Sequence, residues 1–171
     1  GLISAGKEAN VYFAYSRDKT PVALKIYKKD AHSVRWMGRY IHGDPRFTKV
    51  GKTAIRIVYT WAKKEFKNLS RLAKFEINAP RPYKIRENVM MMSYIGDSNG
   101  NPAPRLKDVS DFDNIDKEIK TSMSFIEDMY TKTKLVHGDL SEFNILYHNN
   151  TQYLIDVSQA VSNVHPEALY F

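Results

Sequence analysis

The chain contains no cysteine among its 171 residues, which excludes a disulfide framework and any metal site built from thiolates. It also has no long hydrophobic run. Val89-Met90-Met91-Met92, for example, is far shorter than the ~20 apolar residues that a membrane-spanning helix needs. The first residues lack the basic start and the long apolar stretch of a secretory signal peptide. We therefore expect a cytoplasmic location.

The positive charge of the chain is concentrated in one segment. Hydrophobic residues make up 43% and charged residues 26%, as in folded globular proteins, and the formal net charge is +7. Residues 28–56 contain eight basic side chains and two acidic ones, Asp30 and Asp44, which gives this segment a net charge of 8 − 2 = +6. The basic residues are Lys28, Lys29, Arg35, Arg39, Arg46, Lys49, Lys52 and Arg56. A concentrated basic patch indicates an anionic partner such as nucleic acid or phosphate.

The N-terminal third predicts a hairpin followed by an insertion. Residues 9–15 and 22–27 are β-branched and aromatic and predict two strands, joined by a turn over 16–21. A loop over 4–8 leads into the first strand. Residues 28–53 are polar, basic and rich in glycine, and we expect a flexible insertion with a short helix.

The middle of the chain predicts a helix and two more strands. Trp61, Glu65, Leu69 and Leu72 fall on one helical face, while most of the lysines and arginines around them fall elsewhere. Pro80 and Pro82 end this helix, and residues 83–85 and 88–94 predict strands. Residues 95–104 have the glycine and proline content of a linker.

The C-terminal part predicts a long helix and a hairpin. Apolar residues recur at helical spacing from Ile115 to Tyr130. Residues 145–147 and 153–155 predict two strands joined by 148–152. If the turn centres on residue 150, Asn144 lies opposite Asp156, and two oxygen ligands at the open end of a hairpin suit Mg²⁺. An ordinary role as polar residues at strand ends is equally consistent with these two positions.

Asp139 lies five residues before Asn144. This is the spacing of a kinase catalytic loop, in which the Asp orients the attacking hydroxyl and accepts its proton and the Asn holds a metal ion. Taken alone, Asp139 is more simply a residue that caps a turn. For His137 we expect a structural role, with the imidazole hydrogen-bonded to the backbone or to Asp156.

The strand over 22–27 places Ala23 and Lys25 on one face. A small residue over an adenine ring and a lysine that reaches phosphates are typical of the third strand of a kinase. A carboxylate on the apolar face of a helix needs a partner, and Lys25 is the natural one for Glu65. A solvated Lys25 and a surface Glu65 paired on its own helix remain the simpler alternative. The order of these parts along the chain, rather than any one of them, indicates phosphoryl transfer.

With these motifs the sequence resembles the RIO-type atypical serine/threonine protein kinases, in particular their first subfamily. The resemblance rests on Ser-Ala-Gly-Lys-Glu-Ala-Asn-Val-Tyr at 4–12, His-Gly-Asp-Leu-Ser-Glu-Phe-Asn at 137–144 and Ile-Asp-Val-Ser-Gln-Ala-Val at 155–161. Similar stretches are Gly-Asp-Pro-Arg-Phe at 43–47 and Trp-Ala-Lys-Lys-Glu at 61–65. The loop at 4–8 has one glycine and is a weak signal by itself.

The resemblance implies an α+β, bilobal protein-kinase-like fold. Its N-lobe, 1–92, would hold an antiparallel sheet, one helix and the basic insertion 28–53. Residues 93–104 would form the hinge. The C-lobe, 105–171, would be reduced, mainly helical and without an activation segment, and it would lack the closing helices that the family has beyond Phe171.

The resemblance also implies a non-specific serine/threonine kinase with ATPase activity that uses ATP and Mg²⁺ or Mn²⁺. Asp139 would be catalytic, Asn144 and Asp156 would bind the metal, and Asp156 would also accept phosphate transiently. Lys25 would contact the α- and β-phosphates. The remaining ATP-binding residues would be Ser4, Gly6, Lys7, Ala23, Glu65, Met92, Ser93, Tyr94 and Ile95. Family members act in small ribosomal subunit maturation, which implies pre-ribosomal RNA or protein as a partner of residues 28–56.

Two other functions fit the same residues. Small-molecule kinases of the aminoglycoside or choline type also use His-Gly-Asp followed by Asn, although they usually place an acidic residue soon after the hairpin Asp, where this chain has Val157-Ser158-Gln159. A non-catalytic assembly factor would bind ribosomal RNA or protein through the basic segment. It would depend on Arg35, Arg39 and Arg46 rather than on Asp139.

Overall fold

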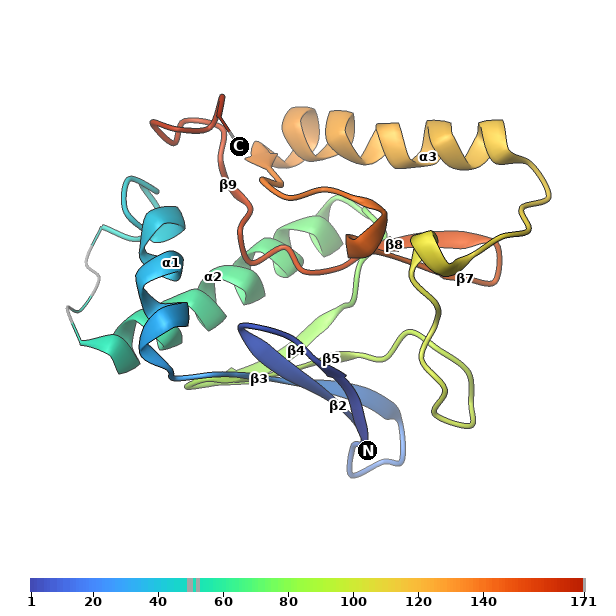
Figure 1. Cartoon of the computed structure of the whole chain (residues 1–171), viewed down its shortest axis with the longest axis horizontal. Helices are drawn as coiled ribbons and strands as arrows, with labels where there is room; N and C mark the ends of the chain where they lie inside the picture. The colour runs from blue at the N-terminus through green and yellow to red at the C-terminus, as the bar shows by residue number, and fades with distance from the viewer. Residues whose placement is uncertain (49–50, 52, 171) are drawn as a thin grey trace.

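A five-stranded antiparallel sheet forms one side of the molecule, as the computed structural model shows in Figure 1. The structure describes residues 1–48, 51 and 53–170. The strand order is β1-β2-β3-β5-β4. The strands are β1 (Leu2–Ala5), β2 (Ala9–Tyr15), β3 (Pro21–Tyr27), β4 (Pro82–Arg86) and β5 (Val89–Ser93). The four strands predicted here are confirmed. The predicted loop over 4–8 is too long, because Ser4 belongs to β1 and pairs with Val11.

Two helices follow β3 in the chain. They are α1 (Ala31–Ile41) and α2 (Ala54–Lys74). Asp30 caps α1 by accepting a hydrogen bond from the backbone N–H of Ser33 at 3.0 Å. Met37 and Ile41 of α1 are fully buried, so the helix within the basic segment forms part of the core. Two basic residues of the segment 28–56, Lys49 and Lys52, lie outside the described residues.

The apolar face predicted for α2 is confirmed in the structure. Trp61, Leu69 and Leu72 are almost completely buried, and Glu65 is buried among them. Lys64 differs from most of the basic residues around this face, because it is itself fully buried. It lies three residues after Trp61, which places it on the same stripe of the helix.

The C-terminal part combines one long helix with short strands. The helix α3 (Ile115–Asp128) continues into a π-helical turn, Met129–Thr133. The strands β7 (Ile145–His148) and β8 (Thr151–Leu154) form a hairpin, and β6 (Leu135–Val136) pairs with β9 (Val161–Ser162). Short 3₁₀ turns cover Leu106–Asp108 and Glu142–Asn144. Figure 1 shows α3 on the opposite side of the molecule from the five-stranded sheet.

The β7–β8 hairpin is tighter than the sequence pattern predicts. Its turn has two residues, Asn149 and Asn150, both with positive φ (49° and 55°), as a type I′ turn requires. Ile145 pairs with Leu154, and the backbone N–H of Ile155 donates to the carbonyl of Asn144 at 2.9 Å. The predicted pairing of Asn144 with Asp156 is therefore wrong by one residue.

Helix α3 is amphipathic as predicted, but its apolar stripe faces outward. Ile115, Ile119, Met123, Ile126 and Tyr130 are each between 52% and 60% exposed. The opposite face packs on β8, where the side chain of Gln152 donates to the backbone carbonyl of Glu118 at 2.9 Å. Within the described part of the chain, no helix combines the length and the apolar character needed to cross a membrane.

Candidate active site

Lys25 joins the sheet, helix α2 and the segment after the hairpin. Its ammonium group donates to Oε1 of Glu65 at 2.8 Å and to Oδ1 of Asp156 at 3.0 Å. The predicted pair of Lys25 and Glu65 is confirmed. The hydroxyl of Tyr27, two residues further along β3, donates to Oε2 of Glu65. Both oxygens of this buried carboxylate are therefore engaged.

The charges in this cluster affect one another strongly. The positive charge of Lys25 lowers the pKa of Asp156 more than burial raises it. Burial opposes the charge on Lys25 itself, but the attraction of Asp156 and Glu65 outweighs burial and raises the pKa of Lys25. Burial also raises the pKa of Glu65. Lys25 thus remains charged and holds an ionised Asp156, whose side chain is 46% exposed.

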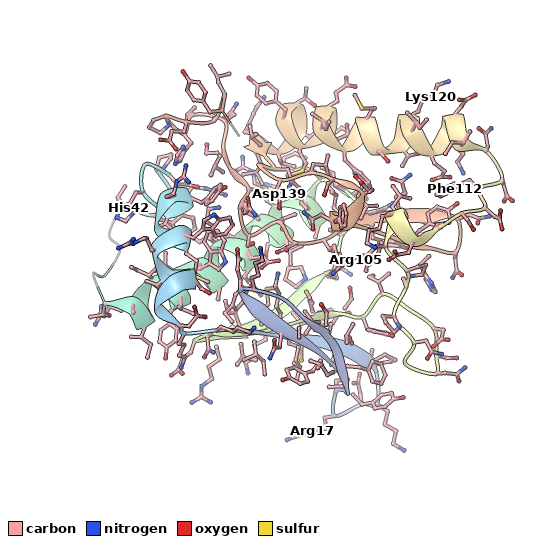
Figure 2. All side chains as sticks on the ribbon, in the orientation of Figure 1. Arg17, His42, Arg105, Phe112, Lys120 and Asp139 are labelled. Carbon is pink, nitrogen blue, oxygen red and sulfur yellow. The ribbon has the colours of Figure 1, made fainter. Side chains whose placement is uncertain are left out.

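Asp139 and Asn144 are in direct contact. The side-chain amide of Asn144 donates to the backbone carbonyl of Asp139 at 2.7 Å and to its Oδ2 at 3.3 Å. Asp139 is exposed, and Figure 2 shows it near the middle of the molecule, between the five-stranded sheet and α3. An exposed carboxylate that is held from one side can accept a proton from a bound hydroxyl group.

The surroundings of His137 fit the structural role predicted for it. It is buried, and its Nδ1 accepts a hydrogen bond from the backbone N–H of Asp139 at 3.3 Å. Burial lowers the pKa of His137. A neutral imidazole that accepts through Nδ1 orients the backbone of Asp139, and a contact with the backbone was one of the two that were expected.

The chemistry of Asn144 and Asp156 fits a magnesium ion. Asn144 uses its amide nitrogen toward Asp139, which leaves its amide oxygen as the atom that can reach a cation. Asp156 is ionised and partly exposed. Mg²⁺ prefers oxygen ligands and needs only one or two from the protein, since water and phosphate supply the rest. The described residues contain no cluster of three or more His, Cys, Asp or Glu side chains suited to a metal ion.

The loop between β1 and β2 is tied to its surroundings at several points. Gly6 donates its N–H to the carbonyl of Ala9 at 2.9 Å, and its own carbonyl accepts from Nζ of Lys28 at 2.7 Å. Lys7 is exposed at the tip of the loop. Of the residues predicted to cover phosphates, Gly6 and Lys7 lie in the loop and Ser4 lies in the strand before it.

Glu8, which the sequence patterns did not single out, connects this loop to α2. Its Oε2 accepts a hydrogen bond from Nε1 of Trp61 at 3.0 Å. Burial, followed by the negative charge of Asp156, raises the pKa of Glu8 to about 7. The contact of Glu8 with Trp61 joins residues 53 positions apart, so the sequence alone gives no signal for it.

The predicted adenine-binding residues lie along β3 and the end of β5. Ala23 is buried and pairs with Met92 across the two strands. The N–H of Ser93 already donates to the carbonyl of Arg81 at 2.8 Å. The carbonyl of Ile95 accepts from Ala103 at 3.1 Å. An adenine ring at this edge would therefore have to use other backbone groups of residues 93–95.

A second polar network, which the sequence analysis did not predict, involves the segment that follows Asp156. Nζ of Lys64 donates to the carbonyls of Ser158 at 2.7 Å and Ala160 at 2.6 Å. Burial, and then the charge of Arg46, lowers the pKa of Lys64 to about 7. Asn68 lies one turn further along α2 and donates to the carbonyls of Val157 at 2.8 Å and Ala160 at 2.9 Å.

Arg46 belongs to this network rather than to a free basic surface. Its guanidinium group makes two hydrogen bonds to the carboxylate of Asp44, at 2.9 Å and 2.6 Å, and one to Oδ1 of Asn68 at 2.7 Å. The bonds and charge of Arg46 lower the pKa of the buried Asp44 in spite of its desolvation. The prediction that Arg46 acts with Arg35 and Arg39 in binding a partner does not fit this arrangement.

An antiparallel sheet carrying a buried Lys–Glu pair, joined to a catalytic-type loop and a hairpin, defines a protein-kinase-like, bilobal α+β fold. Solved structures agree. The chain superposes on the Rio2 kinase of Chaetomium thermophilum with a TM-score of 0.73 at 22% identity, covering 96% of this chain and 50% of that one. It also superposes on the ADP/Mg²⁺–phosphoaspartate complex of the same kinase, with a TM-score of 0.72 at 22% identity, covering 98% of this chain and 49% of that one.

The family model of the RIO domain matches residues 10–171, so the chain belongs to the RIO family, in its Rio1 subtype. It is 42% identical to the human serine/threonine-protein kinase RIO1 and 40% identical to the RIO-type serine/threonine-protein kinase Rio1 of Methanocaldococcus jannaschii. These matches cover 100% and 98% of this chain, but only 30% and 57% of the relatives. The chain thus spans less than two thirds of either protein.

Proposed function

We propose that this chain transfers the γ-phosphoryl group of ATP to a serine or threonine hydroxyl, or to water. The observation that carries the proposal is the position of Lys25, which contacts both Glu65 of α2 and Asp156 beyond the hairpin. A lysine held in this way is placed to bind phosphate oxygens. The relatives are longer than this chain, and their names as serine/threonine-protein kinases support the same activity.

In this account Asp139 orients the acceptor and receives its proton. The hydroxyl oxygen attacks the γ-phosphorus, the bond to the bridging oxygen breaks, and ADP leaves with the electron pair. Asn144 holds Asp139 in place through its side-chain amide. Such a reaction needs alignment and charge neutralisation more than covalent help from the protein.

Asn144 and Asp156 are the residues that we assign to Mg²⁺, and Mn²⁺ suits the same oxygen ligands. When bound, the ion neutralises charge on the phosphates. Lys25 would contact the α- and β-phosphates. Ser4, Gly6 and Lys7 would lie over the phosphates, and Ala23, Met92 and residues 93–95 would surround the adenine. The solved Rio2 complex with ADP and Mg²⁺ supports this choice of ligands by fold alone.

Asp156 is also a candidate acceptor of the phosphoryl group. That Rio2 complex contains a phosphoaspartate. In this chain Asp156 is ionised by its contact with Lys25 and is partly exposed. One of its carboxylate oxygens would attack the γ-phosphorus as ADP leaves. Water would later hydrolyse the acyl phosphate and release inorganic phosphate.

Radiolabelled ATP tests this assignment. We expect the wild type to retain label that hydroxylamine removes, because hydroxylamine cleaves acyl phosphates and leaves phosphoserine intact. Asp156→Ala should abolish the labile fraction, and Asp139→Ala should abolish turnover. Label that resists hydroxylamine and persists in Asp156→Ala would rule out Asp156 as the acceptor.

We further propose a cytoplasmic role in small ribosomal subunit maturation, through RNA or protein bound at residues 28–56. Support comes from Arg35 and Arg39, which are exposed one turn apart on α1. Both line a hollow of about 540 Å³ between α1 and the C-terminal segment. Positive side chains with this spacing suit a chain of phosphates.

A further inference from the structure

Helix α2 contacts the segment after Asp156 through two buried polar side chains. Lys64 and Asn68 donate four hydrogen bonds, between 2.6 Å and 2.9 Å, to the backbone carbonyls of residues 157, 158 and 160. Both side chains are completely buried. Arg46 orients the amide of Asn68 by donating to its oxygen at 2.7 Å.

The segment held in this way contacts both predicted catalytic carboxylates. The hydroxyl of Ser158 donates to Oδ1 of Asp156 at 3.2 Å. The side-chain amide of Gln159 donates to Oδ2 of Asp139 at 3.1 Å. Asp156 itself has a left-handed backbone conformation with φ of 59°, which a residue other than glycine adopts only when its surroundings hold it there.

A lysine is a costly residue at the fully buried position 64. Among the described residues, no carboxylate lies within ion-pair distance of Lys64. Its amine contacts the two carbonyls and the ring of Trp61, whose centroid is 5.2 Å from Nζ. Burying an ammonium group is costly when the charge leaves water without gaining an ionic partner. Lys64 instead uses two hydrogen bonds to fix carbonyls whose neighbours contact the reacting groups.

We propose that Lys64 and Asn68 are positioning residues for phosphoryl transfer. They hold residues 157–160 so that Ser158 and Gln159 set the carboxylates of Asp156 and Asp139. Neither residue touches the nucleotide in this account. The same helix holds Lys25 through Glu65, so α2 aligns the lysine and both aspartates at once. This proposal rests on the proposed kinase function.

The test compares Lys64→Met with Lys63→Met, which removes the exposed neighbouring lysine on the same helix. We expect Lys64→Met to lower kcat at least about 10-fold per folded molecule while the dissociation constant for ATP changes less than about 3-fold. Its melting temperature should fall, because the buried carbonyl of Ser158 loses its donor. Amide hydrogen exchange of residues 156–161 in the nucleotide-free protein should become at least about 5-fold faster, with no change in β2 or β3. Lys63→Met should match the wild type in all four measurements.

The proposal is overturned if Lys64→Met and Lys63→Met have equal kcat, or if exchange of residues 156–161 is unchanged. Should Lys64→Met fail to fold, Gln159→Ala decides, because it removes the contact with Asp139 without opening the core. A several-fold lower kcat is then expected, and an unchanged kcat overturns the proposal. A wild type without phosphotransfer would refute the kinase function, and the exchange comparison alone would then decide whether the segment is held by Lys64.

Discussion

Glu8 lies where the loop after β1 meets α2, with its carboxyl group accepting from Trp61. Burial and the nearby charge of Asp156 raise the pKa of this group from 4.5 to about 7. A carboxyl whose pKa is higher in the folded than in the unfolded state favours folding only while it is protonated. Its contribution therefore decreases as the pH rises from 4.5 toward 7.

This raised pKa predicts the pH dependence of Glu8→Gln. In the wild type, ionisation of Glu8 should lower the unfolding free energy between pH 4.5 and 7 by on the order of 3 kcal/mol. The variant should lack this decrease. Glutamine keeps an oxygen that can accept from Trp61 and cannot ionise. Urea denaturation at a series of pH values provides the measurement. Parallel stability curves for the wild type and the variant across this range would contradict the raised pKa.

The residues near Lys25 show what sequence reasoning could and could not reach. The pair of Lys25 and Glu65 was predictable, because a carboxylate on an apolar helical stripe needs a partner and the strand lysine was available. Lys64 and Asn68 lie on the same stripe, so their burial was also within reach. Their partners were not, since backbone carbonyls that are about 90 residues away carry no side-chain signal.

At the level of elements, helix α3 has its apolar stripe on the surface. Ile119 and Met123 are 55% and 60% exposed, whereas Phe125 is 5% exposed on the packed side. The helical period was predictable from the spacing of these residues. The direction in which the stripe faces was not, because it depends on which other elements contact α3. The hairpin register is a similar case. The turn has two residues where five were predicted, so the residue opposite Asn144 is Ile155 instead of Asp156.

The exposure of this stripe predicts how substitutions behave in this chain. Ile119→Lys with Met123→Lys should change the unfolding free energy by less than about 0.5 kcal/mol, since both side chains are already half in water. Phe125→Ala should cost about 3–5 kcal/mol. Chemical denaturation measures both. Burying one large apolar side chain contributes roughly 2–3 kcal/mol. A larger loss of unfolding free energy in the double lysine variant would show that the stripe is covered in solution.

At the scale of the whole molecule, the ion pair of Lys25 with Asp156 joins the sheet to the C-terminal elements across 131 positions of sequence. Helix α2 strengthens this junction through Glu65, Lys64 and Asn68. Contacts of such long sequence separation are the part of a fold that local patterns do not specify. They also make the geometry of the candidate site depend on both halves of the chain.

The charge distribution predicts salt-dependent binding to RNA through α1. Arg35→Glu with Arg39→Glu should weaken binding of a single-stranded RNA oligonucleotide and reduce the slope of log K against log salt by about 1–2. The matched control is Arg17→Glu with Lys19→Glu, which reverses two charges in the β2–β3 turn, where Figure 2 shows Arg17 far from α1. Fluorescence anisotropy at several salt concentrations gives both slopes. Equal effects of the two double variants would exclude α1 as the binding surface.

The most direct test of the account is Mg²⁺-dependent turnover of ATP by the wild type, Asp139→Ala and Asp111→Ala. Asp111 is an exposed carboxylate before α3 and serves as the charge-matched control. Asp139→Ala should reduce kcat by at least about 100-fold, as expected on loss of a general base, with ATP binding retained. Asp111→Ala should behave as the wild type. Undiminished turnover in Asp139→Ala would contradict the assignment of Asp139 as the catalytic residue.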